Sequence, residues 1–156
     1  MMKELKLTIE LVPSTSWYNN LRSVLPKSVW DKIRKKTYAK YGYRCGICGA
    51  KGRLNCHEIW EYDDQNHVQK LVGFIALCDL CHHVKHIGLA SILASEGKLD
   101  YERVVEHFMK VNGCDRKTFE RHRREAFDQW RERSRYDWNV DLGEYEGLVK
   151  PGRRSS

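Results

Sequence analysis

The chain has 156 residues, of which 41% are hydrophobic and 31% are charged, a composition that describes one modest globular domain with extensions. It contains no apolar run approaching the roughly 20 residues of a membrane span, and its N-terminus lacks the apolar stretch of a signal peptide. We therefore expect a soluble, cytoplasmic protein without a membrane partner. In that reducing compartment, its six cysteines favour metal binding over disulfide bonds.

The positive charge is concentrated near the N-terminus. The formal net charge is +7, and residues 1–44 hold ten Lys and Arg against three acidic residues, a surplus equal to that of the whole chain. A basic surface beside a metal site favours a polyanionic partner, and nucleic acid is the polyanion we expect. Ordinary solubilising charge is the alternative interpretation, and charge alone does not decide between the two.

The N-terminal part predicts one strand and two helices. Apolar residues alternate with polar ones over 5–11, which is the period of a half-buried strand. Helical spacing follows from Trp17 to Leu25, where Pro26 stops the helix. A basic helix is expected over 28–41, ended by Gly42. Three of its outward-facing residues are candidate nucleic-acid contacts: Arg34, Lys35 and Lys36.

Two Cys-x2-Cys pairs are the strongest metal signal in the sequence. Four thiolates are the ligand set that zinc prefers in a closed, tetrahedral structural site. Two pairs of buried free cysteines are the alternative interpretation. The expected ligands of a structural zinc ion are Cys45, Cys48, Cys78 and Cys81.

The stretch between the two cysteine pairs predicts a strand pair followed by a helix. The first strand is expected over 54–60, a polar connection over 61–70 and an apolar strand over 71–77. The helix is expected to begin near Asp79, a suitable N-cap residue. A zinc ion held by both pairs would then attach the strand pair to the helix.

Two histidines of that helix, His82 and His86, are four residues apart and share one helix face, where they can hold a second metal ion. A hydrogen-bonded pair without metal is the alternative. The intervening His83 projects away from the line that joins them. The remaining histidines are expected to be surface or structural residues: His67, His107 and His122.

The C-terminal part predicts two more helices. Asp100 can cap a helix that ends at Gly113, and a longer helix is expected over 115–135. Basic residues of the longer helix are candidate phosphate contacts, although interleaved acidic residues also fit a solvated face with ion pairs. The candidate phosphate contacts of this helix are Arg121 and Arg124. Beyond it, residues 150–156 are expected to be disordered.

Residues 43–88 resemble the HNH endonuclease family in its four-cysteine, zinc-stapled form. The order of the Cys pairs, Cys56-His57-Glu58 in the first strand, and Cys81-His82-x2-Lys85-His86 at the start of the helix carry the resemblance. It implies an α+β protein with a ββα-metal (His-Me finger) core and a structural zinc ion. N-terminal strand and helices and a C-terminal helical extension would flank that core, as in some bacterial and phage members.

The resemblance and the charge pattern together suggest a division of the chain. The tail is expected to fold back on the core through Trp138, Leu142 and Tyr145. The predicted parts are an N-terminal strand and basic-helix extension over 1–42, a zinc-stapled HNH core over 43–96, a helical extension over 97–138, and a tail over 139–156.

The resemblance also implies an activity, namely metal-dependent hydrolysis of phosphodiester bonds in DNA, with RNA as the other candidate substrate. His57 would be the general base, since an imidazole can take a proton from water near neutral pH. A single divalent ion, Mg²⁺, Mn²⁺, Ni²⁺ or Zn²⁺, would polarise the phosphate and stabilise the leaving oxygen. Its implied ligands are His82 and His86, and Lys85 would touch phosphate.

The residue before the expected base departs from the family. Cys56 stands where the family has an Asp or His that ligates the catalytic metal, and a thiolate suits zinc better than magnesium. Strand alternation directs Cys56 and His57 to opposite faces unless a bulge intervenes. Cys56 is therefore either an extra ligand of a softer ion or an inward-packing residue, and we favour the second interpretation.

A second departure lies in the apolar strand. The family's Asn is expected five residues before Cys78, where this chain has Gly73. That Asn braces the hairpin loop, a role for which Asn66 and Gln69 are candidates. The two departures support an alternative function, a catalytically inactive, zinc-containing nucleic-acid-binding module on the HNH scaffold.

Overall fold

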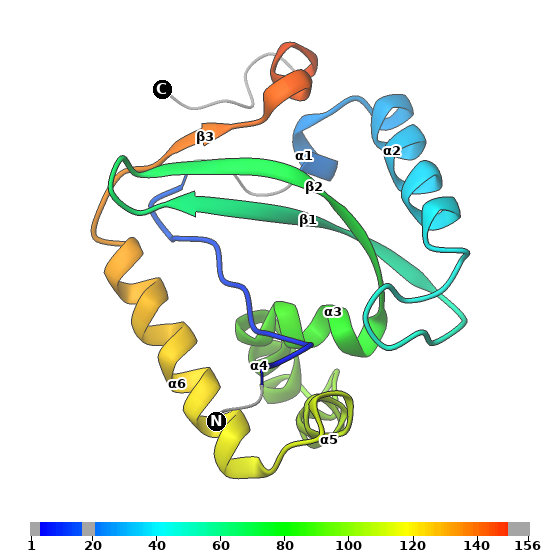
Figure 1. Cartoon of the computed structure of the whole chain (residues 1–156), viewed down its shortest axis with the longest axis vertical. Helices are drawn as coiled ribbons and strands as arrows, with labels where there is room; N and C mark the ends of the chain where they lie inside the picture. Colours follow the sequence, from blue (N-terminus) through cyan, green and yellow to red (C-terminus); the bar gives the residue numbers. More distant parts are fainter. Residues whose placement is uncertain (1–3, 17–20, 150–156) are drawn as a thin grey trace.

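The computed structural model describes residues 4–16 and 21–149. Trp17 and the tail over 150–156 lie outside this part of the chain, so the predictions made for them are not tested. The described residues form an α+β structure with a three-stranded sheet (Figure 1). In chain order its elements are α1 Leu21–Val24, α2 Lys27–Lys40, β1 Leu54–Asp63, β2 Val68–Cys78, α3 Asp79–Lys85, α4 Ile87–Ser95, α5 Tyr101–Asn112, α6 Arg116–Arg133, β3 Asn139–Asp141 and the 3₁₀ helix η1 Gly143–Leu148.

The β1–β2 hairpin is the central element. Its antiparallel register pairs Leu54 with Cys78 and His57 with Ile75, and a bulge lies between Ile59 and Trp60. Both strands are longer than predicted and extend into the stretch expected to be a polar connection. The actual turn is tight because the carboxylate of Asp63 accepts hydrogen bonds from the backbone N–H groups of the next residues.

The C-terminal tail adds the third strand. β3 pairs in parallel with β2, so the strand order is β1-β2-β3 and β1 lies at one edge of the sheet. Trp138, Val140 and Leu142 are buried at this end of the molecule, and Tyr145 packs against the apolar cluster that contains Val140 and Leu142. The prediction that the tail folds back on the core is confirmed.

Helices lie on both sides of the hairpin (Figure 1), and the buried apolar residues form two separate core clusters. One joins the N-terminal segment, the end of β2 and helices α3 to α6, with Phe108 and Phe119 in edge-to-face contact at 5.1 Å between ring centroids. The other joins α1, α2, the sheet and the tail around Trp30 and Leu71. Because each core uses residues from β1 or β2, the hairpin fixes the position of the helices relative to one another.

The helix ends follow the predicted capping in part. Asp100 caps α5 through the backbone N–H of Arg103, and Gly113 follows α5 with a left-handed φ of 60°. The expected N-cap of α3 is wrong by one residue. Cys78 is the N-cap, and its Sγ accepts the hydrogen bond from the backbone N–H of Cys81, so a metal-ligand candidate also begins the helix.

The strand predicted over residues 5–11 is not formed. Leu7 and Ile9 are buried, as the alternation predicts, but no neighbouring strand pairs with this segment among the described residues. Helix side chains take the place of that strand. Asn112 Oδ1 accepts from Leu7 N at 2.8 Å while its Nδ2 donates to Leu7 O at 2.9 Å, and His122 Nε2 accepts from Ile9 N at 2.9 Å.

Replacing Asn112 with Ala should destabilise the fold strongly. The side chain is 2% exposed, and its loss leaves both backbone groups of Leu7 without a partner in a buried position. We expect a loss of about 2 to 4 kcal/mol in the free energy of unfolding measured with denaturant. The exposed Asn139→Ala serves as the control, and an equal effect of both variants would contradict this account of the N-terminal segment.

Candidate metal centres

The first cysteine pair lies in a knuckle that packs on β2. Gly46 N donates to Ala76 O at 2.7 Å, which brings the loop against the strand. A Cβ atom at Gly46 would lie 2.8 Å from Ile75 Cγ1 and 2.9 Å from the Tyr41 ring, so only glycine permits this approach. Cys48 N donates to Cys45 Sγ at 3.5 Å, and backbone amides aimed at thiols are suited to stabilise thiolates.

The four predicted thiols form one cluster that fits a metal ion such as zinc. The Sγ atoms of the cluster lie within 4.8 Å of one another. The Sγ atoms of Cys48 and Cys78 are 3.6 Å apart. This distance is close to the S–S separation of about 3.8 Å in a tetrahedral site with Zn–S bonds of about 2.3 Å. The members of the cluster are Cys45, Cys48, Cys78 and Cys81.

Contacts among the thiols change the pKa of the individual cysteines. The hydrogen bonds from Cys78 and Cys81 lower the pKa of Cys45, and the same contacts raise the pKa of the two donors. Ionisation of Cys45 is therefore favoured, and a bound cation would favour ionisation of Cys78 and Cys81 as well. His107 lies outside this set, with Nε2 3.2 Å from Cys81 Sγ, as expected for a histidine with a structural role.

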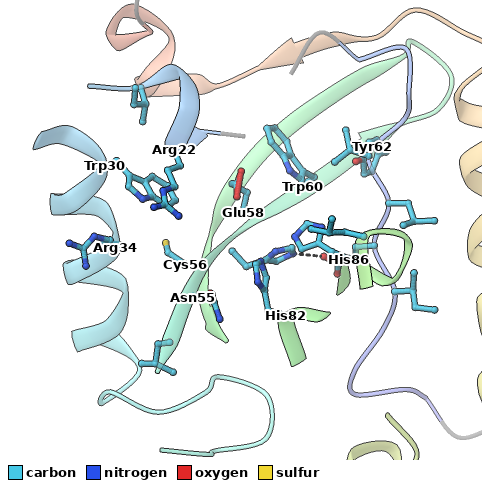
Figure 2. A pocket seen from close by; sticks show the side chains of 18 of the residues that line it. Arg22, Trp30, Arg34, Asn55, Cys56, Glu58, Trp60, Tyr62, His82 and His86 are labelled. Atoms are coloured by element: carbon cyan, nitrogen blue, oxygen red, sulfur yellow. Dashed lines mark hydrogen bonds and ion pairs between the residues drawn. The ribbon is translucent and has the colours of Figure 1, made fainter. Parts of the chain in front are cut away.

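Three histidines form a second cluster on the other side of β1 from Cys56. His57 comes from β1 and His82 from α3, whereas His86 lies at the junction of α3 and α4 rather than inside one helix. One ring nitrogen of each lies within 4.8 Å of the others. Figure 2 shows His82 and His86 side by side at the edge of the cleft. The sequence predicted each of these residues as part of one site, and the fold brings them together.

Burial keeps two of the three histidines, His82 and His86, neutral. Burial lowers the pKa of His82 to about 3 and that of His86 to about 4, with further lowering from the neighbouring histidines. At pH 7 their imidazoles are uncharged, which is the form that binds a metal ion. Three imidazoles with an open position are a donor set that holds Zn²⁺ and other divalent first-row ions.

The expected phosphate contact of Lys85 is wrong. Its side chain is buried between α3 and the N-terminal segment, where Nζ donates to Glu10 Oε2 at 2.8 Å and to Thr8 Oγ1 at 3.1 Å. Burial of a lysine requires such a partner, and the partner comes from a segment 75 residues away in sequence. The sequence motif contained no sign of this carboxylate.

The second carboxylate oxygen of Glu10 contacts the histidine cluster. Its Oε1 accepts a hydrogen bond from His57 Nε2 at 3.0 Å. Partial burial by itself would raise the pKa of Glu10, but the hydrogen bonds and the charge of Lys85 outweigh that effect and lower the pKa to about 2. Glu10 is therefore ionised at neutral pH and is a member of the site that sequence reasoning missed.

Cys56 belongs to neither metal cluster within the described part of the chain. It points from β1 toward α2 (Figure 2), where it packs against the core around Trp30. The only bulge in the β1–β2 register lies further along, between Ile59 and Trp60, so strand alternation separates Cys56 from His57. Burial raises the pKa of Cys56 to about 11, which keeps the thiol protonated. The alternative role of Cys56 as a metal ligand is wrong.

The candidates for the missing Asn occupy different environments. Asn66 lies in the hairpin turn and donates from Nδ2 to Asp63 Oδ2 at 2.8 Å. It therefore braces the loop, the role that the family Asn was expected to have. Gln69 is the second residue of β2 and is fully buried, whereas Asn66 lies in the turn itself. A Cβ atom at Gly73 would have room, with Ile59 Cδ1 at 3.9 Å, so the glycine does not mark a close approach there.

A cleft of about 1040 Å³ runs from the histidine cluster along β1. Its walls come from the N-terminal segment, α2 and α6, so the two predicted extensions both contribute to it. The lining contains both aromatic and charged side chains. The aromatic members are Trp30, Tyr38, Trp60, Tyr62 and Trp130; the basic members are Arg22, Lys27, Arg34, Arg53 and Arg133; the acidic members are Glu10, Asp31 and Glu58.

The predicted nucleic-acid contacts lie in different places. Arg34 lines the cleft, with its guanidinium also bonded to Asp31 at 3.0 Å. Lys35 and Lys36 are exposed on α2 outside the cleft lining. Arg121 and Arg124 of α6 line two other surface hollows and are not part of the cleft lining, so their contact with phosphate stays a prediction.

Other residues of the cleft wall were not anticipated. α6 presents Trp130 and Arg133 to the cleft, and the guanidinium of Arg133 pairs with Asp64 at 2.8 Å and lies 4.1 Å from the Tyr62 ring centroid. Arg53, which directly precedes β1, and Trp60 of β1 also line the cleft. No local pattern marks these residues, because the cleft is assembled from segments that are far apart in sequence.

Comparisons of the chain with protein-family models, curated proteins and solved structures found no match. Among the described helices, each is too short or too polar to cross a bilayer.

The thiol cluster should bind one zinc ion that stabilises the protein. We expect Cys48→Ser to lower the bound zinc and the melting temperature, because a structural zinc site contributes directly to the free energy of folding. Elemental analysis and thermal unfolding measure both quantities. Cys114→Ser changes a cysteine outside the cluster and should retain the zinc. Full zinc content in Cys48→Ser would contradict the assignment.

The histidine cluster should make stability depend on pH. Burial lowers the folded pKa of His86 to about 4 from the ordinary value of 6.5, so the unfolded chain takes up the proton first. The neutral histidine therefore stabilises the fold above pH 6.5, and this contribution is lost as the pH falls toward 4. The slope is about 1.4 kcal/mol per pH unit for each differential proton. Without added divalent ions, His86→Gln should flatten the unfolding free energy between pH 6.5 and 5, whereas an unchanged slope would contradict the burial argument.

Proposed function

We propose that the protein is a metal-dependent endonuclease of HNH type that hydrolyses phosphodiester bonds in DNA. The observation that carries this proposal is the convergence of His57, His82 and His86 within 4.8 Å at the end of a basic, aromatic-lined cleft. The order of hairpin, thiol cluster and helix supports the likeness to a ββα-metal core. The proposed zinc ion would hold α3 against the hairpin so that the histidines stay opposed.

In this proposal the residues divide the chemistry between them. His82 and His86 would hold a divalent ion, which supplies Lewis-acid polarisation of the phosphate and stabilises the leaving oxygen. His57 would take a proton from the attacking water through Nδ1, the ring nitrogen that is not bonded to Glu10. Cationic side chains along the cleft, among them Arg22 and Arg53, would attract the phosphate backbone, and the aromatic lining offers faces for bases.

A second candidate function is a nucleic-acid-binding module without catalysis. Two observations favour it: Cys56 faces away from the histidine cluster, and Lys85 is committed to Glu10 rather than open to phosphate. Such a protein would keep the cleft and its charge and would bind nucleic acid without cleaving it. The two candidates are distinguished by cleavage and not by binding.

Replacing His57 with Ala should abolish cleavage. Loss of a general base lowers the rate by about 10²- to 10⁴-fold, while the thiol cluster lies on other side chains and should keep its zinc. The measurement is nicking of supercoiled plasmid with Mg²⁺, Mn²⁺ or Ni²⁺, alongside zinc content and melting temperature. His67→Ala is the matched control, because His67 stacks on Tyr136 outside the cluster. Equal cleavage by wild type and His57→Ala would refute the assignment.

A further inference from the structure

The N-terminal segment delivers one carboxylate to the histidine cluster, and that carboxylate is held from two sides. Glu10 N donates to Lys85 O at 3.1 Å, which fixes the backbone of the segment against the end of α3. The side chain then spans Lys85 Nζ, at 2.8 Å from Oε2, and His57 Nε2, at 3.0 Å from Oε1. Both carboxylate oxygens thus have a charged or polar partner.

The contact with Glu10 determines which nitrogen of His57 carries the hydrogen. An ionised carboxylate only accepts hydrogen bonds, so a neutral His57 must place its hydrogen on Nε2. The other ring nitrogen, Nδ1, is buried and has no hydrogen-bond partner among the described residues. The His57 ring centroid lies 5.1 Å from that of His86 and 5.7 Å from that of His82, so the ring is adjacent to the other two imidazoles.

We propose that Glu10 is a positioning residue that holds His57 as the Nε2–H tautomer and leaves the Nδ1 lone pair free for the chemistry of the cluster. The role of this tautomer in catalysis rests on the proposed function, whereas the assignment of the tautomer does not depend on it. A carboxylate behind a functional imidazole fixes both its orientation and its protonation pattern. The N-terminal segment is then part of the active site and not an appendage to the core.

Lys85 has a defined role in this arrangement. Its side chain is 6% exposed and orients the carboxylate by occupying Oε2, so that Oε1 is directed to His57. Thr8 Oγ1 accepts a further hydrogen bond from the same ammonium at 3.1 Å, which leaves Lys85 bound to the segment at two points. The basic residue of the helical motif therefore acts on the site through Glu10 instead of through the substrate.

Glu10→Gln tests the proposal because it preserves size and removes the charge. The amide has one oxygen for two donors, so when that oxygen stays with Lys85 the NH₂ group faces His57 Nε2 and favours hydrogen on Nδ1. ¹⁵N chemical shifts of the His57 ring report the tautomer directly. We expect Nε2–H in the wild type and a gain of Nδ1–H in Glu10→Gln. The exposed Glu4→Gln, in the same segment, should resemble the wild type.

Kinetics provide the second readout. If wild-type protein cleaves plasmid, Glu10→Gln should lower kcat about 10- to 100-fold with KM changed little, as for outer carboxylate partners of functional histidines. Nδ1–H in the wild type, or an unchanged tautomer in Glu10→Gln, would overturn the proposal. If the wild type shows Nε2–H and Glu10→Gln gains Nδ1–H, but the wild type cleaves no nucleic acid, the positioning role is upheld and the proposed function is refuted.

Discussion

The convergence of four thiols from two distant Cys-x2-Cys pairs is the constraint on which the rest of the structure depends. One pair lies in a knuckle pressed onto β2 and the other joins the end of β2 to the start of α3. With Cys48 and Cys78 Sγ atoms 3.6 Å apart, a single ion can hold the knuckle, the strand and the helix together. Such an attachment would hold α3 across the hairpin, where His82 lies next to His57.

The β1–β2 hairpin separates the apolar core next to α2 from the histidine cluster. Successive side chains of β1 point to opposite faces, so Cys56 enters the core next to α2 while His57 enters the histidine cluster. The Cys56 thiol keeps its proton in the apolar core, whereas the His57 ring lies next to the imidazoles of His82 and His86. One residue step along a strand therefore decides which of two adjacent metal-binding residue types takes part in the site.

The sequence predicted the features that depend on local patterns. Cysteine spacing and the two histidines four residues apart needed only short-range geometry, and the cap at Asp100 needed only one turn. The features that it did not predict depend on contacts over long sequence distances. Alternation over 5–11 correctly indicated buried residues but could not reveal that Asn112 replaces a strand partner.

Contacts over long sequence distances also explain the error at Lys85 and the cleft residues that the sequence did not indicate. Lys85 was expected to face phosphate because its position in the motif is local information, whereas the carboxylate that binds it comes from Glu10. Arg121 and Arg124 follow a helix face, but which face of α6 borders the cleft is set by packing against the N-terminal segment, and Trp130 occupies that face, with its Nε1 bonded to Val12 O at 2.9 Å.

The most direct measurement is a metal-resolved cleavage assay with the zinc-containing protein on supercoiled plasmid, single-stranded DNA and RNA. The account predicts that DNA is cleaved only when a further divalent ion is added, since the thiol cluster and the histidine cluster have different roles. Binding of all three nucleic acids without cleavage, whichever ion is added, would contradict a catalytic role for the histidine cluster and leave the binding module as the function.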